Sequence, residues 1–93
     1  MERATFVMAV RQTCAAAEIA AQAGPQDFRF DAFQLLAFFR RYDDWGLSQT
    51  LVSTSNDELF LRTAEAALTM AGRNEFAASL ALLEQAQSLL SST

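Results

Sequence analysis

The stretch "FRFDAFQLLAFFRRYDDW", from Phe28 to Trp45, decides the fold of this chain. It contains seven of the chain's ten aromatic residues. Apolar positions recur through it at helical spacing and fill one arc of a helix: Ala32, Leu35, Leu36, Phe38, Phe39, Tyr42 and Trp45. Such an arc is typical of a helix that packs one side against a protein core. We therefore expect a helix over residues 31–44.

The start of this helix is predicted from its capping residues. Asp31 followed by Gln34 matches a capping box, and Phe30 is placed to staple onto Leu35. Gly24 and Pro25 end the preceding helix, because glycine suits a left-handed cap and proline cannot continue a helix. Residues 26–30 are then expected to form a connector.

The segment before this connector is rich in alanine, the best helix former. It predicts a helix over residues 2–23. One of its faces carries Phe6, Val10, Thr13, Cys14, Ala17 and Ala21. The second half of that face bears small side chains, so another helix can approach it closely.

Three further helices are expected after residue 45. A short one spans 47–53, and Ser55 with Glu58 forms a capping box for a helix that ends near Gly72. Asn74 is expected to cap a last helix that reaches about residue 90. Phe76, Leu83 and Leu90 recur there every seven residues, which fits core packing or a short coiled-coil seam. No segment alternates like a half-buried strand. We predict a compact all-α bundle of four to five helices, the last two an antiparallel hairpin, in one domain over residues 1–93.

The last two predicted helices resemble a tetratricopeptide hairpin over about 30 residues. The matching positions are Ala67, Phe76, Ser79, Leu83 and Ala86. The glycine of that motif falls at Asn74, its closing proline is absent, and no second copy follows. The resemblance implies a helical hairpin that can present a surface to a peptide.

The composition argues against catalysis and against cofactor or metal chemistry. The chain has no histidine, so the commonest general base and metal ligand is missing. Cys14 lies among small core residues, and the pairs Asp43–Asp44 and Asp57–Glu58 point apart because neighbouring helix positions diverge. No metal-ligand spacing and no glycine-rich phosphate loop occurs. We expect a protein that is not an enzyme and binds no cofactor.

Charge and hydropathy restrict the partners. The net charge is −4, all seven basic residues are arginine, and residues 46–55 of a forced helix-turn-helix contain no Arg or Lys. Direct binding to nucleic acid is therefore not expected. No apolar run approaches the roughly 20 residues of a membrane span. Arg11, Gln12 and Glu18 interrupt any signal-peptide core. With a single cysteine, these features predict a cytoplasmic protein that does not bind membranes.

The remaining hypothesis is that the chain carries a surface that binds another protein. Phe33 falls outside the apolar arc and beside Arg40 and Arg41, so it is either covered by a loop or contacts a partner. Met8, Ala15 and Ile19 form a second apolar stripe on the first helix, which is either scattered surface or the contact for a second chain. The predicted partner-binding residues are Phe33, Arg40, Arg41, Tyr42 and Trp45, with Met8 and Ile19 as a second patch.

Two functions remain open from the sequence. The first is a protein-interaction module, such as an adaptor, an inhibitor or a secretion-type chaperone, which binds a protein or a protein helix through aromatic and arginine side chains. A homodimer, formed through the first or the last helix, or a heterocomplex accompanies this reading. The alternative is a small acidic regulator of phage or mobile-element type, which mimics nucleic acid and inhibits a nucleic-acid-binding protein.

Overall fold

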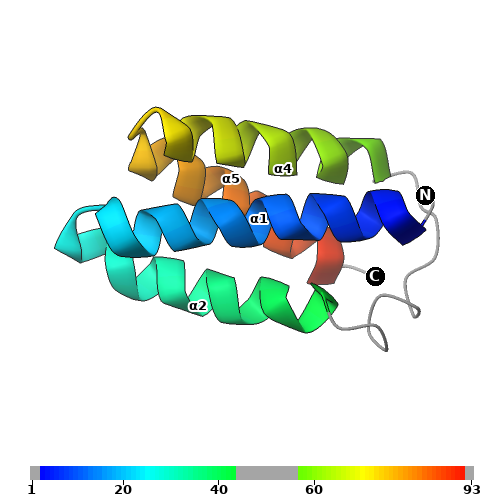
Figure 1. The fold of residues 1–93 in the computed structure, drawn as a ribbon, viewed down its shortest axis with the longest axis horizontal. Helices are drawn as coiled ribbons and strands as arrows, with labels where there is room; N and C mark the ends of the chain where they lie inside the picture. Colours follow the sequence, from blue (N-terminus) through cyan, green and yellow to red (C-terminus); the bar gives the residue numbers. More distant parts are fainter. Residues whose placement is uncertain (1–2, 44–56, 92–93) are drawn as a thin grey trace.

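Four helices run through the part of the chain that the computed structural model describes, residues 3–43 and 57–91 (Figure 1). They are α1 (Arg3–Ala23), α2 (Gln26–Asp43), α4 (Asp57–Gly72) and α5 (Phe76–Ser91). No strand occurs within those two ranges, so the prediction of an all-α bundle is confirmed. The predicted helix over 47–53, the Ser55 capping box and Trp45 lie outside the described residues.

The helices pack around α1, which contacts α2, α4 and α5. The last two helices also pack against each other, and α2 contacts α5, while α2 and α4 do not meet. In Figure 1, α1 and α4 run in the same direction and α2 and α5 run against them. Helices α1 and α5 each contact three helices, whereas α2 and α4 each contact two and keep broader outward sides.

Alanines form the tightest part of the core. They are fully buried on both central helices: Ala16, Ala17 and Ala20 on α1, and Ala64, Ala67 and Ala71 on α4. Side-chain size sets how closely two helices approach, so these alanines allow α1 and α4 to pack closely. Toward the other end Phe6 stacks on Phe60, with ring centroids 5.7 Å apart.

Helix α2 begins five residues earlier than predicted, and the connector over 26–30 is wrong. The chain enters the helix directly after Pro25, whose carbonyl oxygen accepts a hydrogen bond from the Phe28 amide at 2.9 Å. Proline favours the first helical turn, because its fixed φ suits the helix and its missing N–H would have no partner there. Asp31 is consequently an exposed residue of the second turn and not a cap. Phe30 does not serve as a staple, since it is 69% exposed.

The turn between α1 and α2 requires glycine. Gly24 is buried, and a β-carbon at this position would collide with the carbonyl oxygen of Ala20. The Gly24 amide donates a hydrogen bond to that same oxygen at 3.0 Å. On the other side of the turn, Nε of Arg29 donates to the Gly24 carbonyl at 3.0 Å. These contacts hold the turn between α1 and α2 together.

Asn74 ends α4, and the prediction that it caps α5 is wrong. Its φ of 62° lies in the left-handed region, which asparagine tolerates better than most residues. The Asn74 amide donates to Ala71 at 3.1 Å, and the Glu75 amide donates to Met70 at 2.9 Å. This pair of bonds is a Schellman motif. The Glu75 carbonyl then accepts the first bond of α5, from the Ser79 amide at 3.0 Å.

The leucines of α5 face the core. Leu83 and Leu90 are buried, so the seven-residue spacing reflects packing inside the bundle. Ser79 is also fully buried, and its hydroxyl donates to the Ala67 carbonyl of α4 at 2.8 Å. No buried side-chain polar atom in the described ranges lacks a hydrogen-bond partner.

Candidate protein-binding surface

The outward side of α2 carries two exposed phenylalanines. Phe30 is 69% exposed and Phe33 is 56% exposed. Residues three and four positions apart are neighbours on a helix surface, so these rings share one stripe with the exposed residues that follow. We call this stripe the α2 outer face: Phe30, Phe33, Gln34, Ala37 and Arg41. Two large exposed rings three residues apart form a small apolar patch, which offers a place for a partner to make contact.

A shallow groove of about 330 Å³ runs between α1 and α2 beside this stripe. Its lining consists of Phe33, Leu36, Ala37 and Arg40 from α2, and Glu18, Ala21 and Gln22 from α1. An Arg40 nitrogen lies 3.3 Å from Oε1 of Glu18, and both side chains are largely exposed. Such a pair adds little to stability, at most about 1 kcal/mol, but it fixes a guanidinium next to an aromatic ring. Aromatic anchors beside arginine are enriched at protein interfaces.

The structure brings together Phe33 and Arg40 in the groove and places Arg41 on the α2 outer face. It separates Tyr42 from them. The Tyr42 ring is half-buried against the core and lies 5.2 Å from the Phe38 ring. Tyr42 therefore lies on the apolar arc and not beside Phe33. Trp45 lies outside the described residues.

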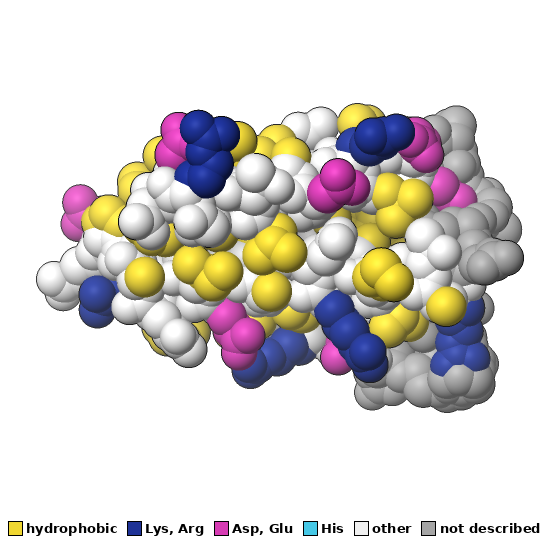
Figure 2. Space-filling model, turned by 45° about the horizontal axis from the view of Figure 1, so that its top comes forward, with side chains coloured by type: hydrophobic (Ala, Val, Ile, Leu, Met, Phe, Trp, Pro, Cys, Tyr) yellow, Lys and Arg dark blue, Asp and Glu magenta, His cyan; other side chains and the backbone are white. Residues whose placement is uncertain are grey.

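The second predicted patch is divided along α1. Met8 is 63% exposed, whereas Ile19 is half-buried against the core. The two residues are eleven positions apart, which corresponds to roughly 16 Å along a helix. Apolar side chains gather along the seam between α1 and α4 in Figure 2, and half-buried residues of these helices include Ile19, Leu61 and Leu68. Ile19 thus belongs to the packing of the bundle.

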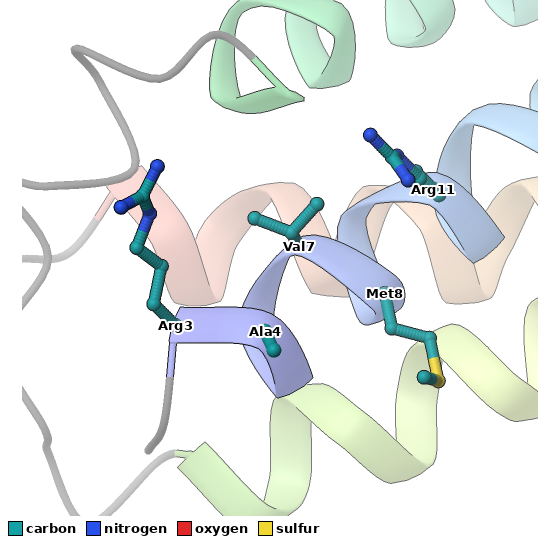
Figure 3. A pocket seen from close by; sticks show the side chains of 5 residues that line it. All are labelled: Arg3, Ala4, Val7, Met8 and Arg11. Carbon is teal, nitrogen blue, oxygen red and sulfur yellow. The ribbon is translucent and has the colours of Figure 1, made fainter.

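Met8 lines a second hollow, of about 560 Å³, on the first half of α1 (Figure 3). The other lining residues are Arg3, Ala4, Val7 and Arg11. Nε of Arg11 donates to a carboxylate oxygen of Asp43 at 3.1 Å, which ties α1 to the end of α2. The described residues that line this hollow all come from α1, and no residue of another described helix joins them.

Phe30 is the residue that the sequence reasoning missed. The sequence pattern predicts that it lies in a connector, where it would staple a helix start. The signal that could have placed it correctly is Pro25: a proline after a glycine both ends one helix and begins the next. With the helix beginning at Gln26, Phe30 and Phe33 stand three residues apart on the same side.

Two features of the described residues bear on metal binding and on thiol reactivity. They contain no group of three or more His, Cys, Asp or Glu side chains that could hold a metal ion. Burial, and after it the Asp43 carboxylate, raises the pKa of the Cys14 thiol from 9.0 to about 11. The thiol is therefore protonated at neutral pH, and a protonated thiol is a poor nucleophile. No described helix combines the length and apolarity that crossing a membrane requires.

Comparison with known proteins gives no relative. Neither a protein family, nor a curated protein, nor a solved structure matches this chain significantly.

Proposed function

We propose that this chain is a non-enzymatic protein-interaction module, such as an adaptor, an inhibitor or a secretion-type chaperone. It binds another protein through the α2 outer face and the adjoining groove. The observation that carries this proposal is the pair Phe30 and Phe33, both more than half exposed on one side of one helix. Covering two aromatic rings is the main energy source of many interfaces, and arginine commonly flanks them.

The rest of the fold serves as a rigid support in this proposal. The last two helices form an antiparallel hairpin that packs on α1, and α1 in turn holds α2 through the Gly24 turn and the pairs Arg11–Asp43 and Arg40–Glu18. A partner then meets a preformed surface and loses less entropy on binding. We place the module in the cytoplasm, where the free thiol of Cys14 stays reduced.

The nucleic-acid mimic lacks a comparable observation. A mimic needs acidic side chains gathered on one face. Here four acids each lie next to an arginine: Glu18 by Arg40, Asp43 by Arg11, Glu58 by Arg62, and Glu75 by Arg73. Figure 2 shows magenta and blue side chains side by side on the visible face. Salt separates the two functions, because a charge mimic loses affinity steeply with added salt and an aromatic anchor does not.

The test is affinity purification from the native host, followed by sizing of the complex. Wild type, Phe33→Ala and Arg40→Ala are compared with Leu59→Ala, a matched control. Leu59 is 45% exposed and lies on α4, which does not contact α2. We expect wild type and the control to retain the same partner, and Phe33→Ala to lose it. Equal recovery of that partner by all four proteins would exclude the α2 outer face as the binding surface.

A further inference from the structure

Acidic residues lie near the start of α2, and basic residues lie near its end. Asp27 and Asp31 lie in its first two turns, and Arg41 lies in its last turn. All three are exposed, and none forms an ion pair with any described residue. Four other arginines of the described ranges do pair with acids of the same chain. The outer side of α2 therefore holds acids at one end and an unpaired arginine at the other.

If two copies of α2 are related by a two-fold axis, the acidic end of one helix meets the basic end of the other. The axis reverses the helix, so the first half of α2 lies against the second half of a second copy. When this axis passes the middle of the α2 outer face, Phe33 of one copy packs against Ala37 of the other. The large ring then meets a small side chain. Phe30 then lies against the aliphatic stem of the second copy's arginine at position 41, whose guanidinium reaches the acids at positions 27 and 31.

The charges on the opposite flank do not oppose this pairing. Arg29 and Arg40 would approach one another across the axis, but each is already held within its own chain. Nε of Arg29 donates to the Gly24 carbonyl, and Arg40 pairs with Glu18. The carboxylate of Glu18 lies on the same flank and offsets their positive charge. Two-fold pairing thus satisfies Asp27, Asp31 and Arg41, while Arg29 keeps its hydrogen bond to the Gly24 carbonyl and Arg40 keeps its pair with Glu18.

The area agrees with a weak but specific dimer. A free phenylalanine presents about 200 Å², so the two exposed rings supply roughly 500 Å² from both copies. An 18-residue helix is about 27 Å long, and the stem of Arg41 with Gln34 and Ala37 extends the contact along it. A specific interface buries about 1,000 Å² or more in total, so the rings supply about half of that area and the dimer is expected to be weak.

We propose that a second copy of this chain covers the α2 outer face, in an antiparallel two-fold dimer held by Phe30, Phe33 and Arg41. The proposal rests on the proposed function, because it names the occupant of the same surface. Both copies use the same residues, and no additional component is required.

The test uses sedimentation velocity over a wide protein concentration range at low salt. Wild type is expected to show a monomer–dimer equilibrium. Phe33→Ala should weaken the dimer about a hundredfold, because both copies lose an anchor, and Arg41→Glu should weaken it about tenfold. The double variant Asp27→Arg/Asp31→Arg should also weaken it. All four proteins are first checked for equal helicity by circular dichroism.

Mixing the impaired charge variants makes the test specific. In a mixed dimer, Glu at 41 of one copy meets Arg at 27 and 31 of the other, and the unaltered residues meet at the second contact. Mixing Arg41→Glu with Asp27→Arg/Asp31→Arg should therefore restore the dimer. The control is Glu84→Arg, an exposed change on α5, which should not rescue Arg41→Glu. A wild-type chain that stays monomeric at all concentrations, or a dimer that the α2 variants leave unchanged, overturns the proposal.

The outcomes for this proposal and for the proposed function are distinct. A monomeric chain that recovers a different protein through Phe33 overturns the second copy as occupant and leaves the interaction module standing. A dimer that the charge variants break and restore, with no other protein recovered, supports the second copy and removes the adaptor role.

Discussion

Phe33 and Phe39 provide the sharpest test of the bundle, because the same substitution at two positions of one helix should destabilise the protein to very different extents. Phe39 is fully buried, and its ring meets that of Phe38 edge-on at 5.2 Å. Truncating a buried phenylalanine costs about 3–5 kcal/mol, since transfer energy is lost and a cavity remains. Phe39→Ala should therefore lower the free energy of unfolding by that amount.

The cost of Phe33→Ala is much smaller. Phe33 is 56% exposed, so less than half of its roughly 200 Å² leaves water on folding. At about 25 cal/mol per Å², the covered part contributes at most about 2 kcal/mol. Alanine keeps the β-carbon and has a helix propensity about 0.5 kcal/mol better than phenylalanine. We expect a net loss of about 1 kcal/mol.

Urea unfolding, monitored by circular dichroism at fixed temperature, measures the free energy of unfolding of both variants. Thermal melting gives a second readout. A loss of 1 kcal/mol lowers Tm by about 4–8 °C in a domain of this size. Because total stability is often only 5–15 kcal/mol, Phe39→Leu serves as a milder second variant. If Phe33→Ala costs as much as Phe39→Ala, Phe33 is a structural residue, and the α2 outer face is not a surface held for a partner.

Three further predictions concern the interior. Ser79→Ala should lower the free energy of unfolding by about 1 kcal/mol, measured in urea, because the hydrogen bond to the Ala67 carbonyl is lost; no change would mean that this bond is not formed in solution. Gly24→Ala should cost about 1–3 kcal/mol, because the new methyl group meets the Ala20 carbonyl oxygen; an unchanged Tm would show that the turn relaxes freely. The Cys14 thiol has a pKa of about 11 in the folded state against 9.0 unfolded, so the unfolded chain loses its proton first and stability should fall by up to about 2 kcal/mol between pH 9 and 11. Cys14→Ala should lack this fall, and identical pH profiles for the two proteins would contradict the burial of the thiol.

Local sequence signals predicted the helices well wherever neighbouring residues alone decide. The alanines of α1 favour a helix at each position. Gly24 and Pro25 end that helix regardless of what packs nearby. The same signals placed two boundaries wrongly. Asp31 and Asn74 both resemble N-caps in the sequence, yet Asp31 lies inside α2 and Asn74 ends α4. A residue can cap a helix only where free backbone N–H groups lie next to it, and its identity alone does not show where the helix begins.

The candidate surface was predicted in part. Helical periodicity separated Phe33 from the apolar arc of α2, since that depends only on spacing. It could not show that Phe30 joins Phe33, because this required the true start of the helix. Nor could periodicity distinguish Met8 from Ile19. Both lie on one stripe of α1, but Met8 is exposed and Ile19 packs against the core.

The sequence by itself determined which segments are helical and which residues share a side of each helix, because both follow from backbone propensity and a fixed period of 3.6 residues. Only the tertiary structure decided which of those sides is covered. That depends on which helices become neighbours: α4 and α5 cover α1, while α2 is left with its outer face open. Periodicity along one helix carries no information about the neighbour, so the exposure of Phe30 and Phe33 and the groove beside Arg40 appear only once the bundle is assembled.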